Sequence, residues 1–193
     1  MPLEVIVFDF DGTLVDTNGL KEEAYFQIFE DFKAPRELIS SIIRNIKEES
    51  RYAIIEEICQ GLKVTQERDS YFKKYNEIVE EGAIKAKELN NAVQLLEKLS
   101  ANKSLYLSSN TPKIFLDNII EKRGWRHFFK EIYGYPSKKP ETLKSIQKLE
   151  SSSAKQMAVI GDGESDKNSA ESIGCSFYNP NTLSSSELLK VIQ

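Results

Sequence analysis

The sequence predicts an α/β fold with a parallel sheet, interrupted near the N-terminus by a helical segment. Short apolar, β-rich runs alternate with segments of helical period through most of the chain, which is typical of a parallel sheet covered by helices. Residues 17–87 break this alternation, because they contain amphipathic helical patterns and no convincing strand. The chain has 193 residues, enough for one domain with an insertion.

The first predicted strand covers residues 3–8, whose sequence LEVIVF is nearly continuous in apolar residues and ends abruptly in Asp-Phe-Asp-Gly. This pattern is typical of a strand that is buried on both faces and followed by a turn. Further strands are expected at residues 104–107, 131–133, 156–160 and 175–178. The segments between them repeat apolar residues every three or four positions and predict helices at residues 89–101, 113–122, 141–150 and 165–173. We therefore expect a Rossmann-like, three-layer parallel sheet core.

The insertion has the length of a small helical bundle rather than a loop. Its amphipathic segments predict helices at residues 20–32, 35–47, 51–62 and 66–87. We expect residues 1–16 and 88–193 to form the α/β catalytic core and residues 17–87 to form an all-helical cap. Cap residues such as Tyr25, Arg51 and Tyr75 either touch a substrate or belong to solvated helix faces, and the sequence does not choose between these roles.

Composition limits the possible partners and cofactors. The formal net charge of −4 provides no overall basic field, so we expect no nucleic acid partner. No apolar stretch approaches the ~20 residues that span a bilayer, and the first apolar run lacks the basic flank of a signal peptide. We therefore expect a cytoplasmic protein that does not bind membranes. We expect it to be a monomer or a dimer. With His127 as the only histidine and two distant cysteines, a Cys/His zinc site is not expected.

Polar side chains cluster where the predicted strands end. The ligand of an open parallel sheet binds beyond the carboxyl ends of its strands, so residues from distant stretches are expected to meet in one crevice. These residues are Asp9 and Asp11 after the first strand, Ser108, Ser109 and Asn110 after the second, Lys139 past the third, and Asp162 and Asp166 after the fourth. Their side chains fit metal-assisted phosphoryl transfer.

Magnesium is a hard ion that takes oxygen ligands, so carboxylates beside a substrate phosphate suit it. The expected Mg²⁺ ligands are Asp9, Asp162 and the backbone carbonyl of Asp11. Lys139 would balance the charge of the phosphate. We expect Ser108 and the backbone amides of Ser109 and Asn110 to bind phosphoryl oxygens, and Gly12 to let the backbone turn tightly beside the ligand.

The two aspartates of the first loop suit a two-step reaction. Asp9 is the expected nucleophile, because an aspartate can form an acyl-phosphate that water then hydrolyses. Asp11, two residues further on, is expected to protonate the leaving oxygen and then to accept a proton from the attacking water. Taken singly, each of these residues has an ordinary structural explanation, since serines and aspartates after strands are usually turn residues. A calcium loop is not favoured, because a strand rather than a helix precedes the aspartates.

Four segments resemble the motifs of the haloacid dehalogenase superfamily, in the same order and spacing. They are DFDGTLVD (residues 9–16), LYLSSN (105–110), Lys139-Pro140, and IGDGESD (160–166). The helical insertion resembles the cap of the phosphoglycolate-phosphatase-like and β-phosphoglucomutase-like members. This resemblance implies a fold with a helical cap, Asp9 as nucleophile, Asp11 as acid/base and as a metal ligand through its carbonyl, Ser108 and Lys139 at the phosphate, and Asp162 on Mg²⁺. It also implies that Asp166 is a metal ligand or a partner of the ligands.

The resemblance favours phosphoryl transfer over dehalogenation, because true dehalogenases of the superfamily lack the second aspartate that Asp11 supplies here. Two features depart from the commonest pattern: the second motif continues as SSNTP, and Lys138 adjoins Lys139 and is a rival for its role. We expect a phosphatase that acts on a small-molecule phosphate ester, such as a sugar phosphate or a phosphoglycolate-like acid. The alternatives are a phosphomutase and a non-catalytic binding protein on the same fold.

Overall fold

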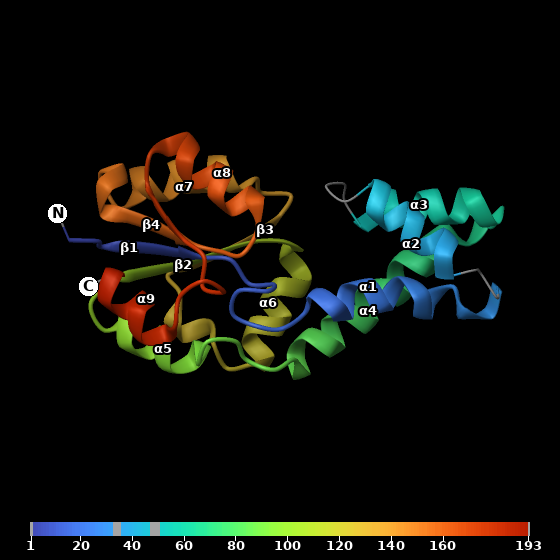
Figure 1. The fold of residues 1–193 in the computed structure, drawn as a ribbon, viewed down its shortest axis with the longest axis horizontal. Coiled ribbons are helices and arrows are strands. Elements are labelled where there is room, and N and C mark those ends of the chain that lie inside the picture. Colours follow the sequence, from blue (N-terminus) through green and yellow to red (C-terminus); the bar gives the residue numbers. More distant parts are fainter. Residues whose placement is uncertain (1, 33–35, 47–50, 193) are drawn as a thin grey trace. The chain divides into compact units, whose positions relative to one another are not determined.

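The computed structural model describes residues 2–32, 36–46 and 51–192, and their α/β part is built on a parallel sheet (Figure 1). The sheet has five strands in the order β3-β2-β1-β4-β5, and all neighbours are parallel. The strands are β1 (Val5–Phe8), β2 (Ser104–Pro112), β3 (Glu131–Tyr135), β4 (Met157–Ile160) and β5 (Ser176–Tyr178). The predicted Rossmann-like α/β fold is confirmed.

β1 is the central strand, with Val5 opposite Ser104 of β2 on one side and Met157 of β4 on the other. All four of its residues are buried, as the apolar run LEVIVF predicts for a strand covered on both faces. Its side chains alternate between the faces, and Val5 and Val7 pack in one cluster with Leu143 and Ala170. The carboxyl end of β1 therefore lies at the middle of one edge of the sheet, the edge where the neighbouring strands also end.

Helices cover both faces of this sheet (Figure 1). One face carries α7 (Lys139–Leu149) and α8 (Glu164–Ile173), and the other carries α5 (Ala92–Ser100), α6 (Lys113–Lys122) and α9 (Ser185–Ile192). Short 3₁₀ turns lie at Arg126–Phe128 and Ala154–Gln156. The helices other than α9 lie where the periodicity predicts them, within a few residues at each end.

Two elements differ from the sequence-based expectation. β2 was expected to end at Leu107, but it continues to Pro112 with an irregular register against β3, so that Ser108, Ser109 and Asn110 lie within the strand. The sequence predicted a turn because serine and asparagine favour turns, but pairing with β3 outweighs that preference. The helix α9 was not expected, because its sequence is short and begins in serines.

The insertion is all-helical in the residues that the structure describes. It contains α1 (Asn18–Ile28), α2 (Arg36–Asn45), α3 (Arg51–Leu62) and α4 (Arg68–Lys85), with 3₁₀ turns at Glu30–Phe32 and Thr65–Glu67. Buried apolar side chains from these helices form one cluster that includes Ile28, Ile55 and Tyr75. The predicted helix at 35–47 lies partly outside the described residues, as does Pro35.

The chain divides into two compact units. The first comprises Met1–Asp16 and Ile84–Gln193, and the second comprises Thr17–Ala83. The second unit has its own apolar cluster, as a separately packed body requires. Its role as a cap stays a prediction.

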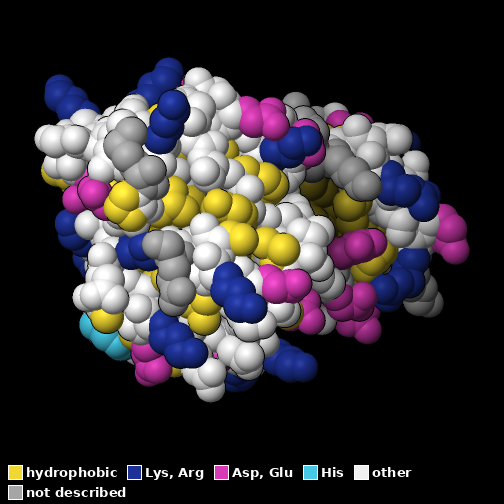
Figure 2. All heavy atoms as spheres, turned by 60° about the vertical axis from the view of Figure 1, so that its left-hand side comes forward, with side chains coloured by type: hydrophobic (Ala, Val, Ile, Leu, Met, Phe, Trp, Pro, Cys, Tyr) yellow, Lys and Arg dark blue, Asp and Glu magenta, His cyan; other side chains and the backbone are white. Residues whose placement is uncertain are grey.

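The surface mixes both signs of charge. On the face that Figure 2 shows, basic and acidic side chains are interspersed with exposed hydrophobic ones. Among the described residues, no helix combines the length and the apolar character needed to cross a membrane.

Gly134 allows β3 to approach the extended end of β2, which yields a prediction about stability. A Cβ atom at this position would lie 2.6 Å from the Cα of Lys113 and 2.7 Å from the carbonyl oxygen of Thr111, and backbone atoms cannot move aside easily. We expect Gly134→Ala to lower the free energy of unfolding by about 1–3 kcal/mol, measured by chemical denaturation. Gly19→Ala is the control, because a Cβ there meets nothing within 4 Å. Equal stability of Gly134→Ala and the wild type would contradict the packing at β3.

Candidate active site

The site begins in the loop after β1. The backbone N–H of Asp9 donates to the carbonyl of Ile160 (2.8 Å), which joins the ends of β1 and β4. Gly12 adopts φ 74°, a left-handed conformation that favours glycine, and its N–H donates to the carbonyl of Val15 (2.8 Å). This tight turn brings Thr13 back toward Asp9. The Thr13 hydroxyl lies 3.5 Å from Asp9 Oδ2 and 3.3 Å from Asp162 Oδ1, so it links the loops after β1 and β4.

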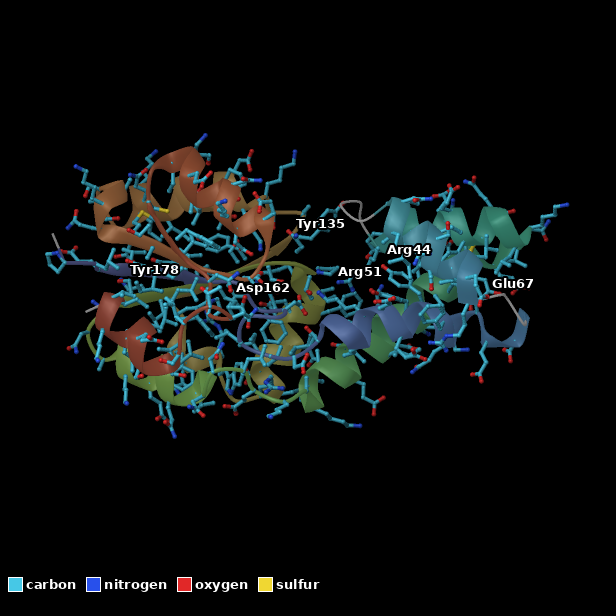
Figure 3. All side chains as sticks on the ribbon, viewed as in Figure 1. Arg44, Arg51, Glu67, Tyr135, Asp162 and Tyr178 are labelled. Atoms are coloured by element: carbon cyan, nitrogen blue, oxygen red, sulfur yellow. The ribbon has the colours of Figure 1, made fainter. Side chains whose placement is uncertain are left out.

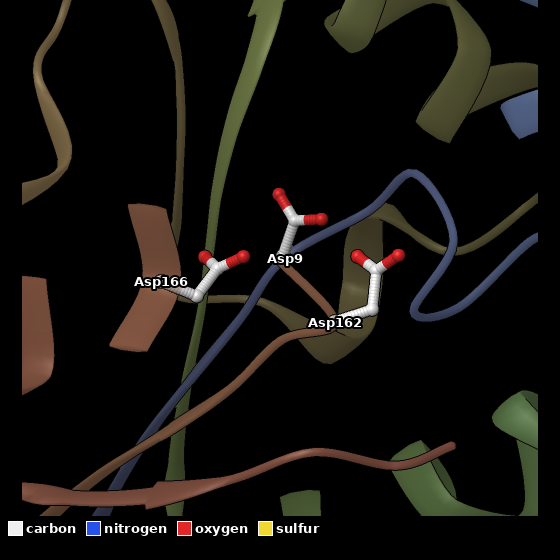
Figure 4. Close-up of side chains that lie close together, drawn as sticks. All are labelled: Asp9, Asp162 and Asp166. Carbon is white, nitrogen blue, oxygen red and sulfur yellow. The ribbon is translucent and has the colours of Figure 1, made fainter. Parts of the chain in front are cut away.

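Three carboxylates converge at this point (Figure 4). Asp9, Asp162 and Asp166 each offer an oxygen, and these three oxygens lie within 4.8 Å of one another. Asp9 and Asp166 are buried, and Asp162 is partly buried. Because neighbouring buried carboxylates repel one another, this cluster favours a bound cation. The donor set of carboxylate oxygens fits a hard divalent ion.

Lys139 is the buried cation of the cluster. Its Nζ donates to Asp9 Oδ1 (2.9 Å) and to Asp166 Oδ1 (2.6 Å). Burial alone lowers a lysine pKa, but the negative charges of Asp9 and Asp166 outweigh it and raise the pKa of Lys139 above its usual value. The ammonium therefore stays charged beside Asp9.

Burial also changes the acidity of the carboxyl groups. Desolvation raises the pKa of Asp9 to about 7; Lys139 opposes this effect, and the charges of Asp166 and Asp11 add to it. Desolvation likewise raises the pKa of Asp166, against the effect of Lys139. Asp166 Oδ2 also accepts the N–H of Gly163 (3.3 Å), so both of its oxygens are engaged by protein groups. Asp166 therefore pairs with Lys139 through one oxygen and with the backbone of its own loop through the other.

Asp11 is held by two hydroxyl groups from the extended end of β2. Its Oδ2 accepts hydrogen bonds from Thr111 Oγ1 (2.8 Å) and Ser109 Oγ (3.2 Å). The Ser109 hydroxyl in turn accepts the backbone N–H of Thr111 (3.0 Å). All three residues are buried, so water does not compete for these bonds. The side chain of Ser109 therefore holds Asp11, and the contact of the Ser109 backbone amide with substrate stays a prediction.

The remaining predicted residues separate into buried and exposed ones. Ser108 is buried and lines a small cavity together with Asp9, Lys139 and Asp166. Asn110 and Lys138 are exposed. Lys138 directly precedes α7, whereas the side chain of Lys139 reaches Asp9. The geometry thus brings Lys139, and not Lys138, to the carboxylate cluster.

Several residues that support the site carried no assigned role in the sequence analysis. Thr13 and Thr111 were overlooked as carboxylate partners, although each lies within a quoted or noted motif. The loop after β5 was missed as well. There, Asn179 Nδ2 donates to the carbonyl of Asp162 (3.3 Å) and Asn181 Nδ2 donates to the carbonyl of Gly12 (3.4 Å). Asparagines in a loop are ordinary turn residues, so no sequence signal singles them out.

Comparison with known proteins places this geometry in a family. A family model described as haloacid dehalogenase-like hydrolase matches residues 6–179. A curated relative, the phosphoglycolate phosphatase of Vibrio cholerae, is 28% identical over 185 residues, a match that covers 90% of this chain and 82% of the relative.

Solved structures share the fold. A HAD-hydrolase of Bacillus subtilis bound to magnesium has a TM-score of 0.79 at 18% identity, with 100% of each chain covered. A β-phosphoglucomutase-type protein of Thermotoga maritima has a TM-score of 0.74 at 21% identity, covering 92% of this chain and 85% of the other. The family resemblance and the prediction of a phosphatase-type hydrolase are confirmed. The chain belongs to the haloacid dehalogenase-like hydrolase family.

Proposed function

We propose that the protein is a magnesium-dependent phosphatase that hydrolyses a small phosphorylated metabolite through an aspartyl-phosphate intermediate. The observation that carries this proposal is the buried Lys139, which bridges Asp9 and Asp166 next to Asp162. A phosphate ester is an anion, and a buried lysine beside a carboxylate nucleophile lowers the repulsion between the two. The curated relative named phosphoglycolate phosphatase supports a phosphoglycolate-like acid as substrate, and a sugar phosphate is the alternative.

The proposed metal site uses Asp9 and Asp162, with the backbone carbonyl of Asp11. Asp9 and Asp162 each offer a carboxylate oxygen to one cluster whose oxygens lie within 4.8 Å of one another, close enough to share a cation. When bound, Mg²⁺ would neutralise charge on the carboxylates and on the transferring phosphoryl group. The structure of the Bacillus subtilis hydrolase is bound to magnesium, which supports the choice of this ion.

Asp9 and Asp11 divide the chemistry. A carboxylate oxygen of Asp9 attacks phosphorus, and the bond from phosphorus to the leaving oxygen breaks as Asp11 protonates that oxygen. In the second step Asp11 accepts a proton from water, which attacks the acyl-phosphate, releases phosphate and restores Asp9. Ser108 and the amides of Ser109 and Asn110 would orient the phosphoryl oxygens during both steps. Lys139 lowers the pKa of Asp9 against the effect of burial, and so favours the ionised nucleophile, and it stabilises the charge that develops on these oxygens.

A phosphomutase shares the first step but returns the phosphoryl group to its substrate, whereas a phosphatase transfers it to water. Phosphate release from simple esters that matches substrate loss therefore favours the phosphatase. A non-catalytic binding protein would show no turnover with any ester in the presence of Mg²⁺.

Substituting the two aspartates separates their roles. We expect Asp9→Asn to lower kcat by about 10⁴-fold or more, because an amide cannot form the acyl-phosphate. We expect Asp11→Asn to lower kcat by about 100- to 10,000-fold with a smaller change in KM, because proton transfer is lost while binding remains. The measurement is phosphate release from a panel of phosphorylated metabolites with Mg²⁺. Activity that survives Asp9→Asn contradicts the mechanism.

Metal binding is also testable without turnover. Mg²⁺ at a hundredfold excess over its Kd should stabilise the protein by about 2.7 kcal/mol, seen as a higher melting temperature than in EDTA. Asp162→Asn should abolish this increment and should raise the melting temperature in EDTA, because it removes one of three neighbouring carboxylates. An undiminished increment in Asp162→Asn excludes that residue as a ligand.

The two hydroxyls on Asp11 give a third prediction. Thr111→Val keeps the shape of the side chain but removes its hydrogen bond to Asp11, so we expect kcat to fall about tenfold while KM changes little. Thr111→Ser retains the hydroxyl and should restore most of the rate. A kcat equal to that of the wild type in Thr111→Val means that the hydroxyl does not help to position Asp11.

A further inference from the structure

A second pocket adjoins the Asp9–Lys139 cluster within the α/β unit. It lies between the end of β2, the segment after β3 and the start of α8, and it has a volume of about 360 Å³. This volume falls in the range of small-molecule sites, about 300–1,000 Å³. Lys139 and Ser169 line both this pocket and the small cavity beside Asp9, so the pocket adjoins the carboxylate cluster.

The residues that line the pocket include amides, hydroxyls and two lysines but no acidic side chain, although apolar atoms make up most of the accessible lining. We call it the Lys138 pocket, after a lining set that includes Asn110, Tyr135, Pro136, Lys138, Ser165 and Asn168. Amide and hydroxyl groups come from β2 and α8, and an aromatic ring and a proline come from the end of β3. Tyr135, the last residue of β3, is 49% exposed, a large exposure for an aromatic side chain (Figure 3). The ring and the hydrogen-bonding groups suit a small organic ligand, and the absence of a carboxylate from the lining suits an anionic one.

Lys138 supplies the charge that is available to such a ligand. Lys139 is committed to Asp9 and Asp166 at 2.9 and 2.6 Å. Lys138 is exposed and forms no ion pair with any residue in the ranges that the structure describes. The two adjacent lysines thus have different environments, one neutralised inside the cluster and one free at the rim of the pocket.

We infer that the Lys138 pocket binds a second anionic group of the substrate, a carboxylate or a phosphate, and that Lys138 pairs with this group. The inference rests on the proposed function, since it places the phosphate to be cleaved at Asp9. It narrows the substrate class to phosphate esters that carry another negative charge close to the first. Asn110 and Asn168 would add hydrogen bonds to the same group, and neutral sugar phosphates would leave Lys138 unpaired.

The test compares matched substrates. 2-Phosphoglycolate carries a carboxylate, 2-hydroxyethyl phosphate carries a neutral hydroxyl in its place, and propane-1,3-diol bisphosphate carries a second phosphate. For each ester, kcat/KM is measured in the wild type, Lys138→Met, Lys138→Arg and Lys144→Met. Lys144 is an exposed lysine of α7 that does not line the pocket, so its substitution controls for loss of one positive charge.

We expect Lys138→Met to reduce the preference for an anionic over the neutral ester about tenfold, as for one charge-assisted hydrogen bond. Lys138→Arg should keep the preference, and Lys144→Met should leave it as in the wild type. The anionic ester whose kcat/KM falls more in Lys138→Met, 2-phosphoglycolate or the bisphosphate, carries the group that Lys138 binds. An unchanged preference in Lys138→Met, or an equal loss in Lys144→Met, overturns the inference.

A separate binding measurement distinguishes this failure from failure of the proposed function. The Asp9→Asn variant is titrated calorimetrically with 2-phosphoglycolate and 2-hydroxyethyl phosphate, with and without Lys138→Met. Tighter binding of the carboxylate ester that depends on Lys138 supports the pocket even if no ester is hydrolysed. Equal affinities for the two esters in both backgrounds refute it, whether or not the wild type is an active phosphatase.

Discussion

The site depends on one buried ammonium group, that of Lys139, held between two buried carboxylates. Burial of an unpaired charge is costly, so the carboxylates of Asp9 and Asp166 and this lysine stabilise one another only while all three remain together. The backbone next to this cluster leaves room for the Asp166 side chain. At Gly161 a Cβ atom would lie 2.3 Å from Cγ of Asp166, so only glycine lets this carboxylate approach the lysine. The cluster has three carboxylates and one lysine, so its excess negative charge favours the binding of a divalent cation.

Much of this arrangement could be predicted from the sequence, because it follows from the topology of a parallel sheet. Strands that are buried on both faces produce continuous apolar runs, and the run at β1 locates the centre of the sheet. Once the strands are placed, their carboxyl ends bring Asp9 and Asp162 to the same edge although they are far apart in the sequence. The structure places both in one carboxylate cluster. The sequence favoured Lys139 with Lys138 as a rival, and the structure brings Lys139 to the cluster, because the register of the start of α7 decides which side chain points inward.

The rest of the site depends on contacts that local sequence patterns do not encode. The extension of β2 through Ser109 and Thr111 arises from pairing with β3, while the residues themselves favour a turn. The hydrogen bonds from Ser109 and Thr111 to Asp11 depend on that extension, so the sequence alone did not predict them. Similarly, the contacts of Asn179 and Asn181 with the loops at Asp162 and Gly12 join segments that are distant in sequence. Supporting residues of this kind have ordinary types, and only their positions give them a role.

The central claim is that Asp9 carries the phosphoryl group during turnover, and chemical trapping tests it most directly. The protein is mixed with Mg²⁺ and a substrate that it hydrolyses, quenched in acid within one turnover, reduced with borohydride and digested for peptide mass spectrometry. Borohydride converts an aspartyl phosphate to homoserine, so the account predicts this change at position 9 and at no other aspartate. Homoserine at another position, or none under conditions where phosphate is released, would contradict the account.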